Sequence, residues 1–336
     1  MLSDKIEEYK KTGKMKKNTP AMYKKEYPWL KEVDALALAN VQLHLEKAYK
    51  NFFRDPKVGF PKFKSKHSSR RSYTTNCVNG NIALQTGSIK LPKLGVIRMK
   101  QHRAIPDAYV LKSATIRQEP SGKYFVSILF AYENQVSECR DVKDVLGIDF
   151  AMNGLAVFSD GTRAEYPMFY KRAQKKLAHE QRNLSRCKRG SRNYQKQKIK
   201  VAKCHEKIKN QRKDFAHKLS EKIAKRYDAV CVEDLNMKAM SQSLHFGKSV
   251  MDNGYGLFLN VMNYKLEEKG KVLVKVGRFY PSSKRCSCCG KVKDNLLLSE
   301  RVYHCSCGNH MDRDVNAAIN IREEGLRILR NSKNCA

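Results

Sequence analysis

The hydrophobic pattern of the chain changes twice, near residue 50 and near residue 144. Residues 1–50 carry apolar side chains at helical spacing among many Lys and Glu residues. Residues 58–140 instead contain short runs rich in β-forming residues, separated by turn signals such as Asn79-Gly80. This pattern predicts helices followed by a small antiparallel barrel or sandwich. The runs are SYTTNCV, NIALQ, GSIKL, GVIRMK, VLKSATIRQ and YFVSILFAY.

Strands and helices alternate in the second half of the chain, after a polar stretch at 134–144 that indicates a boundary. The runs VLGID (145–149) and GLAVFSDG (154–161) predict two strands joined by a tight turn, and TRAEYP (162–167) predicts a third. A long basic helical stretch follows. The later predicted elements are a buried strand at 229–234, a helix at 255–268, a strand at 271–276 and a helix at 314–329. Such alternation is typical of an α/β layer architecture.

The charge of the chain restricts its partners. The 336 residues include 67 Lys and Arg against 33 Asp and Glu, a formal net charge of +34. A polyanion is the natural partner for such a charge. Nucleic acid is favoured over a membrane surface, because neither a terminal basic amphipathic helix nor a lipidation signal is present. Without a long apolar window or a signal-peptide core, we expect a soluble protein of the cytoplasm that binds no membrane.

Half of the excess charge lies in one stretch. Residues 171–226 hold 21 Lys and Arg against 4 acids, a net charge of +17, and their apolar residues recur at helical spacing. The Gly190-Ser191 break predicts a helical hairpin. An ordinary solvated helix face is the alternative interpretation, but it does not explain why so few acids balance the charge. A surface that follows nucleic-acid phosphates does, and its candidate residues beside the break are Lys188, Arg189 and Arg192.

Four acids stand out because of where they fall. Asp149 interrupts an apolar run and Glu233 ends a predicted strand, while Asp312 and Asp314 precede the last helix. Singly, Asp149 could cap a turn, Glu233 could be the polar end of a strand and Asp314 could be a helix N-cap. Together they match the layout of the RNase H-like nuclease fold. Three convergent carboxylates there can hold two divalent ions ~4 Å apart that activate water and stabilise the leaving 3′ oxygen.

Five of the eleven cysteines fall within 22 residues. Cys286-x₂-Cys289 and Cys305-x-Cys307 are each followed by glycine, and this spacing predicts a structural Cys₄ zinc ribbon. Because the second pair has a single spacer residue, His304 could replace Cys305 as a ligand. Buried thiols without a metal are the alternative interpretation.

These motifs together resemble the transposon-encoded TnpB (OrfB) family, relatives of type V CRISPR effectors. The resemblance runs from about Gly59 to Leu326. It is carried by GFPKFKSK, SYTT, GIDFAMNGLAVFSDG, NQRKDFAHKLS, VEDLN, CSCCG, CSCG and DRDVNAAINI. The resemblance implies an RNA-guided DNA endonuclease that uses Mg²⁺ or Mn²⁺. Its partners would be DNA and a guide RNA derived from the transposon end.

The resemblance also implies residue roles and an α+β multidomain architecture. Asp149, Glu233 and Asp314 match the catalytic carboxylates that hold the metal, with Asp312 as the alternative third acid. Cys286, Cys289, Cys305 and Cys307 match the zinc ligands. The expected domains are residues 1–140, a helical recognition segment with a wedge-like β barrel; 141–280, an RNase H-like (RuvC) nuclease domain with the basic insertion 171–226; 281–311, the zinc ribbon; 312–330, the final RuvC segment; and 331–336, a tail.

Two other functions fit the same motifs. One is an RNA-guided DNA-binding regulator that no longer cuts, which the loss of a catalytic acid would mark; here every such position is acidic. The other is an inactive transposon remnant. Because family members usually begin with a further strand and helical segment, we expect a truncated N-terminal lobe and weak guided cleavage.

Overall fold

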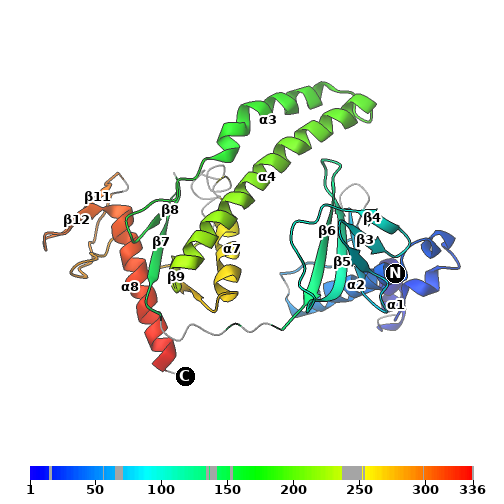
Figure 1. Cartoon of the computed structure of the whole chain (residues 1–336), viewed down its shortest axis with the longest axis horizontal. Helices are drawn as coiled ribbons and strands as arrows, with labels where there is room; N and C mark the ends of the chain where they lie inside the picture. Colours follow the sequence, from blue (N-terminus) through cyan, green and yellow to red (C-terminus); the bar gives the residue numbers. More distant parts are fainter. Residues whose placement is uncertain are drawn as a thin grey trace. The chain divides into compact units, whose positions relative to one another are not determined.

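The chain forms two compact units, Met1–Asn134 and Gln135–Ala336 (Figure 1). The computed structural model describes residues 1–14, 17–55, 57–64, 71–133, 136, 142–151, 154–236, 252, 254–297 and 299–334.

The first unit begins with helices and continues as two small sheets. Its helices are α1 (Leu2–Thr12), the short 3₁₀ turns η1 (Pro20–Tyr23) and η2 (Pro28–Lys31), and α2 (Ala35–Arg54). Asp34 caps α2 by accepting a hydrogen bond from the Leu36 N–H at 3.1 Å. Asn40 on α2 donates to the Thr74 carbonyl at 3.1 Å, which ties the helix to the first strand.

All six strands predicted for this unit are confirmed. They are β1 (Ser72–Asn76), β2 (Ala83–Gln85), β3 (Ser88–Leu91), β4 (Gly95–Arg98), β5 (Val110–Gln118) and β6 (Tyr124–Ala131). They form two antiparallel sheets, ordered β1-β5-β6 and β2-β3-β4. Ile89 and Leu91 of β3 are buried with Ala114 of β5, so the two sheets share one apolar core.

The second unit is built on a four-stranded sheet of order β10-β9-β7-β8. Its strands are β7 (Val145–Ala151), β8 (Leu155–Phe158), β9 (Ala229–Glu233) and β10 (Val272–Val276). β7, β9 and β10 run parallel, and β8 is antiparallel to β7. The helices are α3 (Phe169–Arg186), α4 (Arg192–Arg226), α7 (Tyr255–Glu267) and α8 (Arg313–Asn334). A small ribbon, β11 (Val302–His304) and β12 (His310–Asp312), precedes α8.

Helices cover both faces of this sheet. Alternate strand residues point to opposite faces. Ile148 and Val232 pack with residues of α4 and α7 in the larger core. Cys231, one position along from Val232, packs with Ile321 of α8 in a second core. Asp149 is one position along from Ile148, and Glu233 is two along from Cys231. Both side chains therefore lie on the face of the sheet that α8 covers.

Two glycines allow α8 to lie directly on the sheet. A Cβ atom added at Gly147 of β7 would meet the Ala318 carbonyl oxygen at 2.0 Å. A Cβ added at Gly325 of α8 would meet the Cys231 Sγ at 2.2 Å. Both distances are shorter than any real contact, so only glycine permits this approach of helix and sheet.

Two predictions for this unit are wrong in detail. TRAEYP (162–167) is not a strand: it meets β8 only at the Val157–Arg163 bridge, after which Ala164 and Tyr166 turn inward and are buried. Pro167 could not have continued a ladder, since it has no N–H. The last helix also extends beyond 314–329, because nothing in the sequence up to Asn334 breaks it.

Some predicted features fall largely outside the described residues. These are most of the boundary stretch 134–144 and the turn at 152–153 that precedes β8. Within the described part of the chain, no helix is both long enough and apolar enough to span a membrane.

Candidate functional site

Two of the four acids lie at adjacent positions where the parallel pairing of β7 with β9 ends. Ile148 of β7 is in register with Val232 of β9, and Asp149 and Glu233 are the next residue of each strand. Both belong to the sheet face that α8 covers. The sequence thus places two carboxylates together at the end of a buried sheet, where ligand sites of parallel sheets commonly form.

The electrostatics of Asp149 reflect this crowding. Burial raises the pKa of Asp149 well above its ordinary value, and the negative charges of Glu233 and Asp314 raise it further. The Phe150 N–H and the Arg313 guanidinium oppose the rise without overcoming it. Asp314 therefore lies near enough to Asp149 to affect its ionisation.

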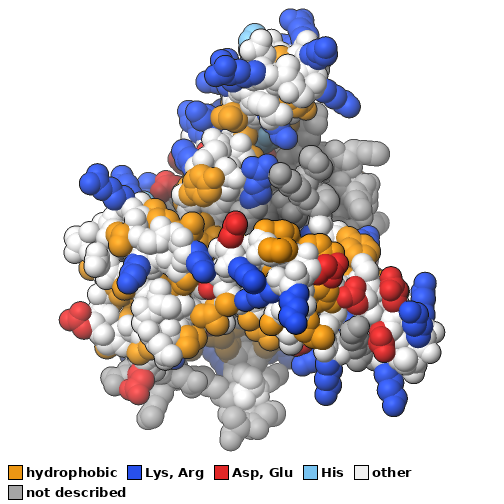
Figure 2. Space-filling model, turned by 90° about the vertical axis from the view of Figure 1, so that its right-hand side faces the viewer, with side chains coloured by type: hydrophobic (Ala, Val, Ile, Leu, Met, Phe, Trp, Pro, Cys, Tyr) orange, Lys and Arg blue, Asp and Glu red, His pale blue; other side chains and the backbone are white. Residues whose placement is uncertain are grey.

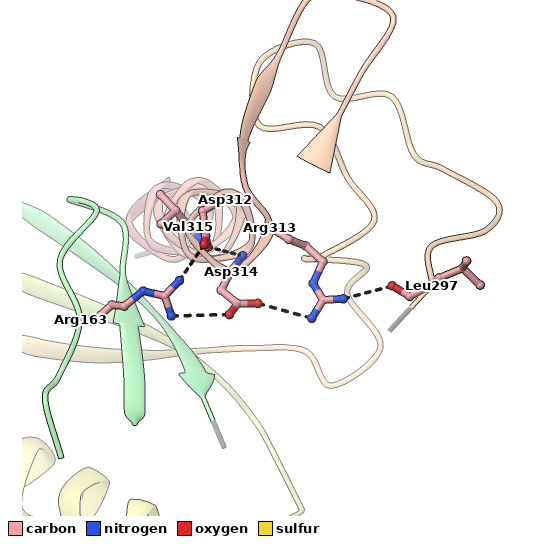
Figure 3. Close-up of polar contacts among 6 residues, drawn as sticks. All are labelled: Arg163, Leu297, Asp312, Arg313, Asp314 and Val315. Atoms are coloured by element: carbon pink, nitrogen blue, oxygen red, sulfur yellow. Dashed lines mark hydrogen bonds and ion pairs between the residues drawn. The ribbon is translucent and has the colours of Figure 1, made fainter. Parts of the chain in front are cut away.

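Asp312 and Asp314 occupy different positions although they are two residues apart (Figure 3). Asp312 caps α8: its Oδ1 accepts hydrogen bonds from the Asp314 N–H at 3.0 Å and the Val315 N–H at 3.1 Å. The alternative interpretation of Asp314 as the N-cap is therefore wrong. Asp312 also forms an ion pair with Arg163 at 2.7 Å, and this pair is largely exposed.

Asp314 lies in the first turn of α8 between two guanidinium groups. Arg163 Nη1 is 3.8 Å from its Oδ2, and Arg313 Nη2 is 3.6 Å from its Oδ1 (Figure 3). Arg163 thus spans both acids of this motif. No sequence signal pointed to Arg163, since it lies in a segment expected to be a strand.

Two further polar groups that sequence reasoning missed lie beside Glu233 and Asp149. Ser282, in the link between β10 and the ribbon, donates its hydroxyl hydrogen bond to Glu233 Oε1. Burial raises the pKa of Glu233, and this hydrogen bond opposes the rise. Tyr255 opens α7 against Phe150, with ring centroids 4.7 Å apart. Its buried hydroxyl has no hydrogen-bond partner within the described part of the chain.

The donor set of this site suits a hard divalent cation. The charges of Glu233 and Asp314 oppose the ionisation of Asp149, and neither Asp149 nor Glu233 forms an ion pair with a described residue. Mg²⁺ and Mn²⁺ prefer such oxygen ligands. A bound cation would add positive charge directly beside these two carboxylates.

The four ribbon cysteines converge on one point. All of their sulfur atoms lie within 4.8 Å of one another. The Sγ atoms of Cys286 and Cys307 are 3.7 Å apart, and those of Cys289 and Cys305 are 3.6 Å apart. Tetrahedral Zn–S bonds of about 2.3 Å would place sulfurs roughly 3.8 Å apart. The geometry therefore fits zinc.

The surroundings of Cys286 favour its thiolate. For Cys307 the Asn309 N–H favours the thiolate too, but hydrogen bonds with the other thiols outweigh it and raise the pKa of Cys307 to about 12. Burial opposes the ionisation of Cys286, but the Cys289 N–H and the Asn309 amide outweigh it and lower the pKa of this thiol to about 6. The alternative ligand His304 is exposed and contacts the ring of His310 instead, with centroids 4.4 Å apart. Cys288 is exposed outside the cluster.

The basic stretch forms the predicted helical hairpin of α3 and α4 (Figure 1). Gly190 turns the chain with a φ of +84°, and Ser191 caps α4 by accepting from the Tyr194 N–H at 3.1 Å. Lys188, Arg189 and Arg192 are exposed at this turn. Figure 2 shows Lys and Arg side chains gathered around the end of the hairpin, at the top of the view.

A groove of about 520 Å³ runs between the same two helices. Phe169, Ala173 and Cys204 give it apolar walls. The cations that line it are Arg172, Lys176, Lys200, Lys203 and Lys207. None of these five forms an ion pair with a residue that the structure describes. Lysine and arginine side chains without an ion-pair partner are suited to bind phosphate groups.

Comparison with known proteins gives consistent matches along the chain. Residues 129–244 match the OrfB_IS605 family, described as "Probable transposase", and residues 255–321 match the "Cas12f1-like, TNB domain". A "Putative RNA-guided DNA endonuclease" of Streptomyces pristinaespiralis is 32% identical over 304 residues, covering 90% of this chain and 74% of that protein. The "Putative RNA-guided DNA endonuclease InsQ" of Escherichia coli K12 is also 32% identical, over 90% of this chain and 78% of its own length.

A solved structure shares the fold. A Cas12f1 chain, determined in complex with sgRNA and target DNA, superposes with a TM-score of 0.58. The match covers 86% of this chain and 71% of that chain at 15% sequence identity. This likeness establishes an α+β architecture of the Cas12f type. With two relatives at 32% identity along most of their length, the chain is a member of the TnpB (OrfB) family.

Proposed function

We propose that the protein is an RNA-guided DNA endonuclease whose second unit is a RuvC-type, RNase H-like nuclease domain. One observation carries the proposal. Asp149 and Glu233 each follow the last paired residue of the parallel strands β7 and β9, on the face that α8 covers, and Asp314 lies in the first turn of α8. Both relatives carry the name "Putative RNA-guided DNA endonuclease", which supports the same interpretation.

The acids would hold divalent cations. Bound Mg²⁺ or Mn²⁺ supplies Lewis-acid activation of water and charge stabilisation for phosphodiester hydrolysis. Asp149 and Glu233 provide unneutralised oxygens on the rigid sheet, and Asp314 adds a third from the helix. Asp312 instead caps α8 and so fixes the turn that carries Asp314. Arg163, which reaches both acids, keeps that turn against the sheet edge.

The ribbon would hold structural zinc. Cys286, Cys289, Cys305 and Cys307 fill all four tetrahedral positions, so the metal has no open position for substrate. Its contribution is to fold the residues between β10 and α8, which lack an extensive apolar core of their own.

The hairpin would bind the backbone of the nucleic acids. Lys188, Arg189 and Arg192 at its end are exposed, and the groove between α3 and α4 adds five cations that form no ion pair with a described residue. The cations at the hairpin end and in the groove would contact phosphates and would not distinguish one base from another. The guide RNA would read the DNA sequence by base pairing.

The proposal extends to the organisation of the chain. Residues 1–140 would be the recognition segment and wedge-like barrel, 141–280 and 312–330 the nuclease domain, 281–311 the ribbon and 331–336 a tail. Because its proposed partners are a guide RNA and DNA, we assign the protein to the cytoplasm.

Sequencing the RNA that co-purifies with the protein, followed by cleavage of a matching DNA, tests the proposal. We expect cleavage that requires Mg²⁺ or Mn²⁺ and the matching target. Asp149→Ala should reduce the rate by several orders of magnitude while leaving RNA binding intact, because losing one ligand disturbs the whole metal site.

Two results would contradict the proposal. One is cleavage by Asp149→Ala at a near-native rate, which would place the chemistry elsewhere. The other is target binding without any cleavage by the parent at any divalent-metal concentration, which is the behaviour of a regulator.

A further inference from the structure

We propose that Ser282 is a positioning residue that orients Glu233, and that through Ser282 the zinc ribbon supports the carboxylate site of the sheet. This inference rests on the proposed function, since it concerns how the proposed metal-binding acids are held. Neither the family motifs nor the sequence pattern singles out Ser282.

The first observation is the contact between Ser282 and Glu233. The Ser282 hydroxyl donates to Glu233 Oε1, and Ser282 is 6% exposed. Among the described residues, no other side chain is hydrogen-bonded to Glu233. Oε1 is therefore held by the protein, and Oε2 makes no hydrogen bond with a described side chain. A single donor of this kind fixes the rotation of a carboxylate that binds metal.

The second observation is that α8 fixes the backbone of Ser282. Asn320 donates to the Ser282 carbonyl at 2.8 Å and to the Arg285 carbonyl at 2.6 Å. Asn316, one turn earlier, donates to the same Arg285 carbonyl at 2.7 Å. Both asparagines are buried, so these amides are committed to the loop rather than to solvent. The helix that carries Asp314 thus also holds the residue that orients Glu233.

The third observation connects this loop to the thiols. Cys286 follows Ser282 by four residues, and the Ser287 N–H donates to Asn316 Oδ1 at 3.0 Å. Asn309, from the second half of the ribbon, donates to Cys286 Sγ at 3.3 Å. The Tyr303 hydroxyl donates to the Lys284 carbonyl at 2.9 Å. The loop therefore has two anchors, α8 at one side and the thiolate cluster at the other.

Through these contacts, the folding of the ribbon affects the orientation of the Glu233 carboxylate. If zinc is lost, the loop keeps its anchor on α8 but loses the one at the thiolates, so Ser282 is held less firmly beside Glu233. The carboxylate of Glu233 then regains rotational freedom. Loss of an outer hydrogen-bond partner of this kind typically weakens metal binding by about 10–100-fold.

Mn²⁺ binding to the full chain tests the inference directly. The variants are Ser282→Ala and, as a matched control, Ser283→Ala at the neighbouring serine, whose hydroxyl makes no hydrogen bond with a described residue. The readouts are the Mn²⁺ dissociation constant by titration calorimetry, the electron paramagnetic resonance spectrum of bound Mn²⁺, and zinc content by elemental analysis. Asp149→Asn serves as the reference for loss of the carboxylate site.

We expect Ser282→Ala to weaken Mn²⁺ binding by about 10–100-fold with one zinc per chain retained, and Ser283→Ala to match the parent. In cleavage assays the Mn²⁺ concentration for half-maximal rate should rise by the same factor while the plateau rate changes little. A merely structural role of Ser282 would lower the plateau instead. Cys289→Ser, which removes a zinc ligand remote from the acids, should weaken Mn²⁺ binding as Ser282→Ala does.

The outcomes separate the inference from the proposed function. If Asp149→Asn abolishes Mn²⁺ binding but Ser282→Ala binds as the parent does, the inference is wrong and the proposed function stands. If Asp149→Asn also binds as the parent does, the carboxylates are not the metal site and both are overturned. Equal losses in Ser282→Ala and Ser283→Ala would also overturn the inference, since they would reflect a general loosening of the loop.

Discussion

Asp312 and Asp314 share one short motif, yet their side chains have separate surroundings. Asp312 makes the cap of α8 and an exposed ion pair, whereas Asp314 couples electrostatically to the buried Asp149. We therefore expect Asp314→Ala to reduce DNA cleavage by several orders of magnitude. Asp312→Ala should instead lower the free energy of unfolding by about 1 kcal/mol, through the lost cap, and reduce cleavage far less.

Cleavage rates and urea unfolding of the two variants check this assignment. The reverse order of effects, with Asp312→Ala the less active of the two at equal stability, would make Asp312 the third metal ligand.

Asp149 provides a prediction about stability and pH. Because its pKa is raised in the folded chain, its stabilising contribution is complete below the pKa of an unfolded Asp, about 3.9, and is lost as pH rises through the folded value. Above that unfolded value, and without divalent cation, Asp149 therefore lowers the stability of the fold relative to an uncharged side chain. Asp149→Asn should raise the unfolding temperature by at least about 2 °C while abolishing cleavage.

Thermal unfolding of zinc-loaded protein in buffer without Mg²⁺ or Mn²⁺, measured between pH 5 and 8, tests this. Added Mn²⁺ should stabilise the parent but not Asp149→Asn. An unfolding temperature for Asp149→Asn at or below that of the parent across this range would show that Asp149 is compensated in the folded chain.

At the scale of elements, few acidic residues balance the lysine and arginine side chains of the α3–α4 hairpin. Replacing Lys188, Arg189 and Arg192 with Ala should weaken binding to nucleic acids of any sequence. The slope of log K against log salt should fall by roughly 0.9 per lost phosphate contact. Replacing three exposed lysines at the end of α1 removes the same charge and serves as the control; they are Lys10, Lys11 and Lys14.

Fluorescence anisotropy of a labelled nucleic acid, measured at several salt concentrations, gives the slope for the hairpin variant and the slope for the control. If the hairpin variant and the control have the same slope, the effect is one of net charge alone and the hairpin makes no specific phosphate contacts.

The contact between α8 and the sheet gives a second element-scale prediction. Gly325→Ala places a methyl group where Cys231 Sγ lies, so helix and strand must separate. We expect a loss of about 1–3 kcal/mol in the free energy of unfolding, as for other overpacked cores. Adding Cys231→Ala should restore part of it, because the two side chains compete for one space.

Urea unfolding of the two single variants and the double variant measures this coupling. Strictly additive losses would mean that Gly325 and Cys231 do not share the space that the structure gives them.

At the scale of the whole molecule, the two units have separate cores and separate internal contacts. Residues 135–336 contain the sheet, α8 and every thiol of the cluster. We therefore expect this fragment to fold alone and to bind one zinc per chain, and Cys289→Ser to abolish that zinc. Elemental analysis and far-UV circular dichroism of the fragment check both statements. A fragment that is unfolded with zinc present would mean that the first unit is needed for the second to fold.

Much of this architecture follows from local pattern. The strands of the first unit were predictable because β-forming runs alternate with glycine and asparagine turns, and the hairpin because Gly190 and Ser191 interrupt a basic helical pattern. The carboxylates could be named because an acid at the end of an apolar strand is costly to bury unless it has a partner or a bound ion. The thiol spacing indicated a ribbon in the same way.

Other features were decided only by packing across the chain. Arg163, Ser282 and Tyr255 carry no local signal. Arg163 and Ser282 contact the acids directly, and Tyr255 packs against Phe150 beside Asp149. Nothing in the sequence around Gly147 and Gly325 marks them. A side chain at either position is excluded only because α8 packs against the sheet there. The sequence by itself determined which side chains are candidates for the chemistry, because their types and spacing are local. Only the tertiary structure decided which groups orient them, because those contacts join segments that lie far apart along the chain.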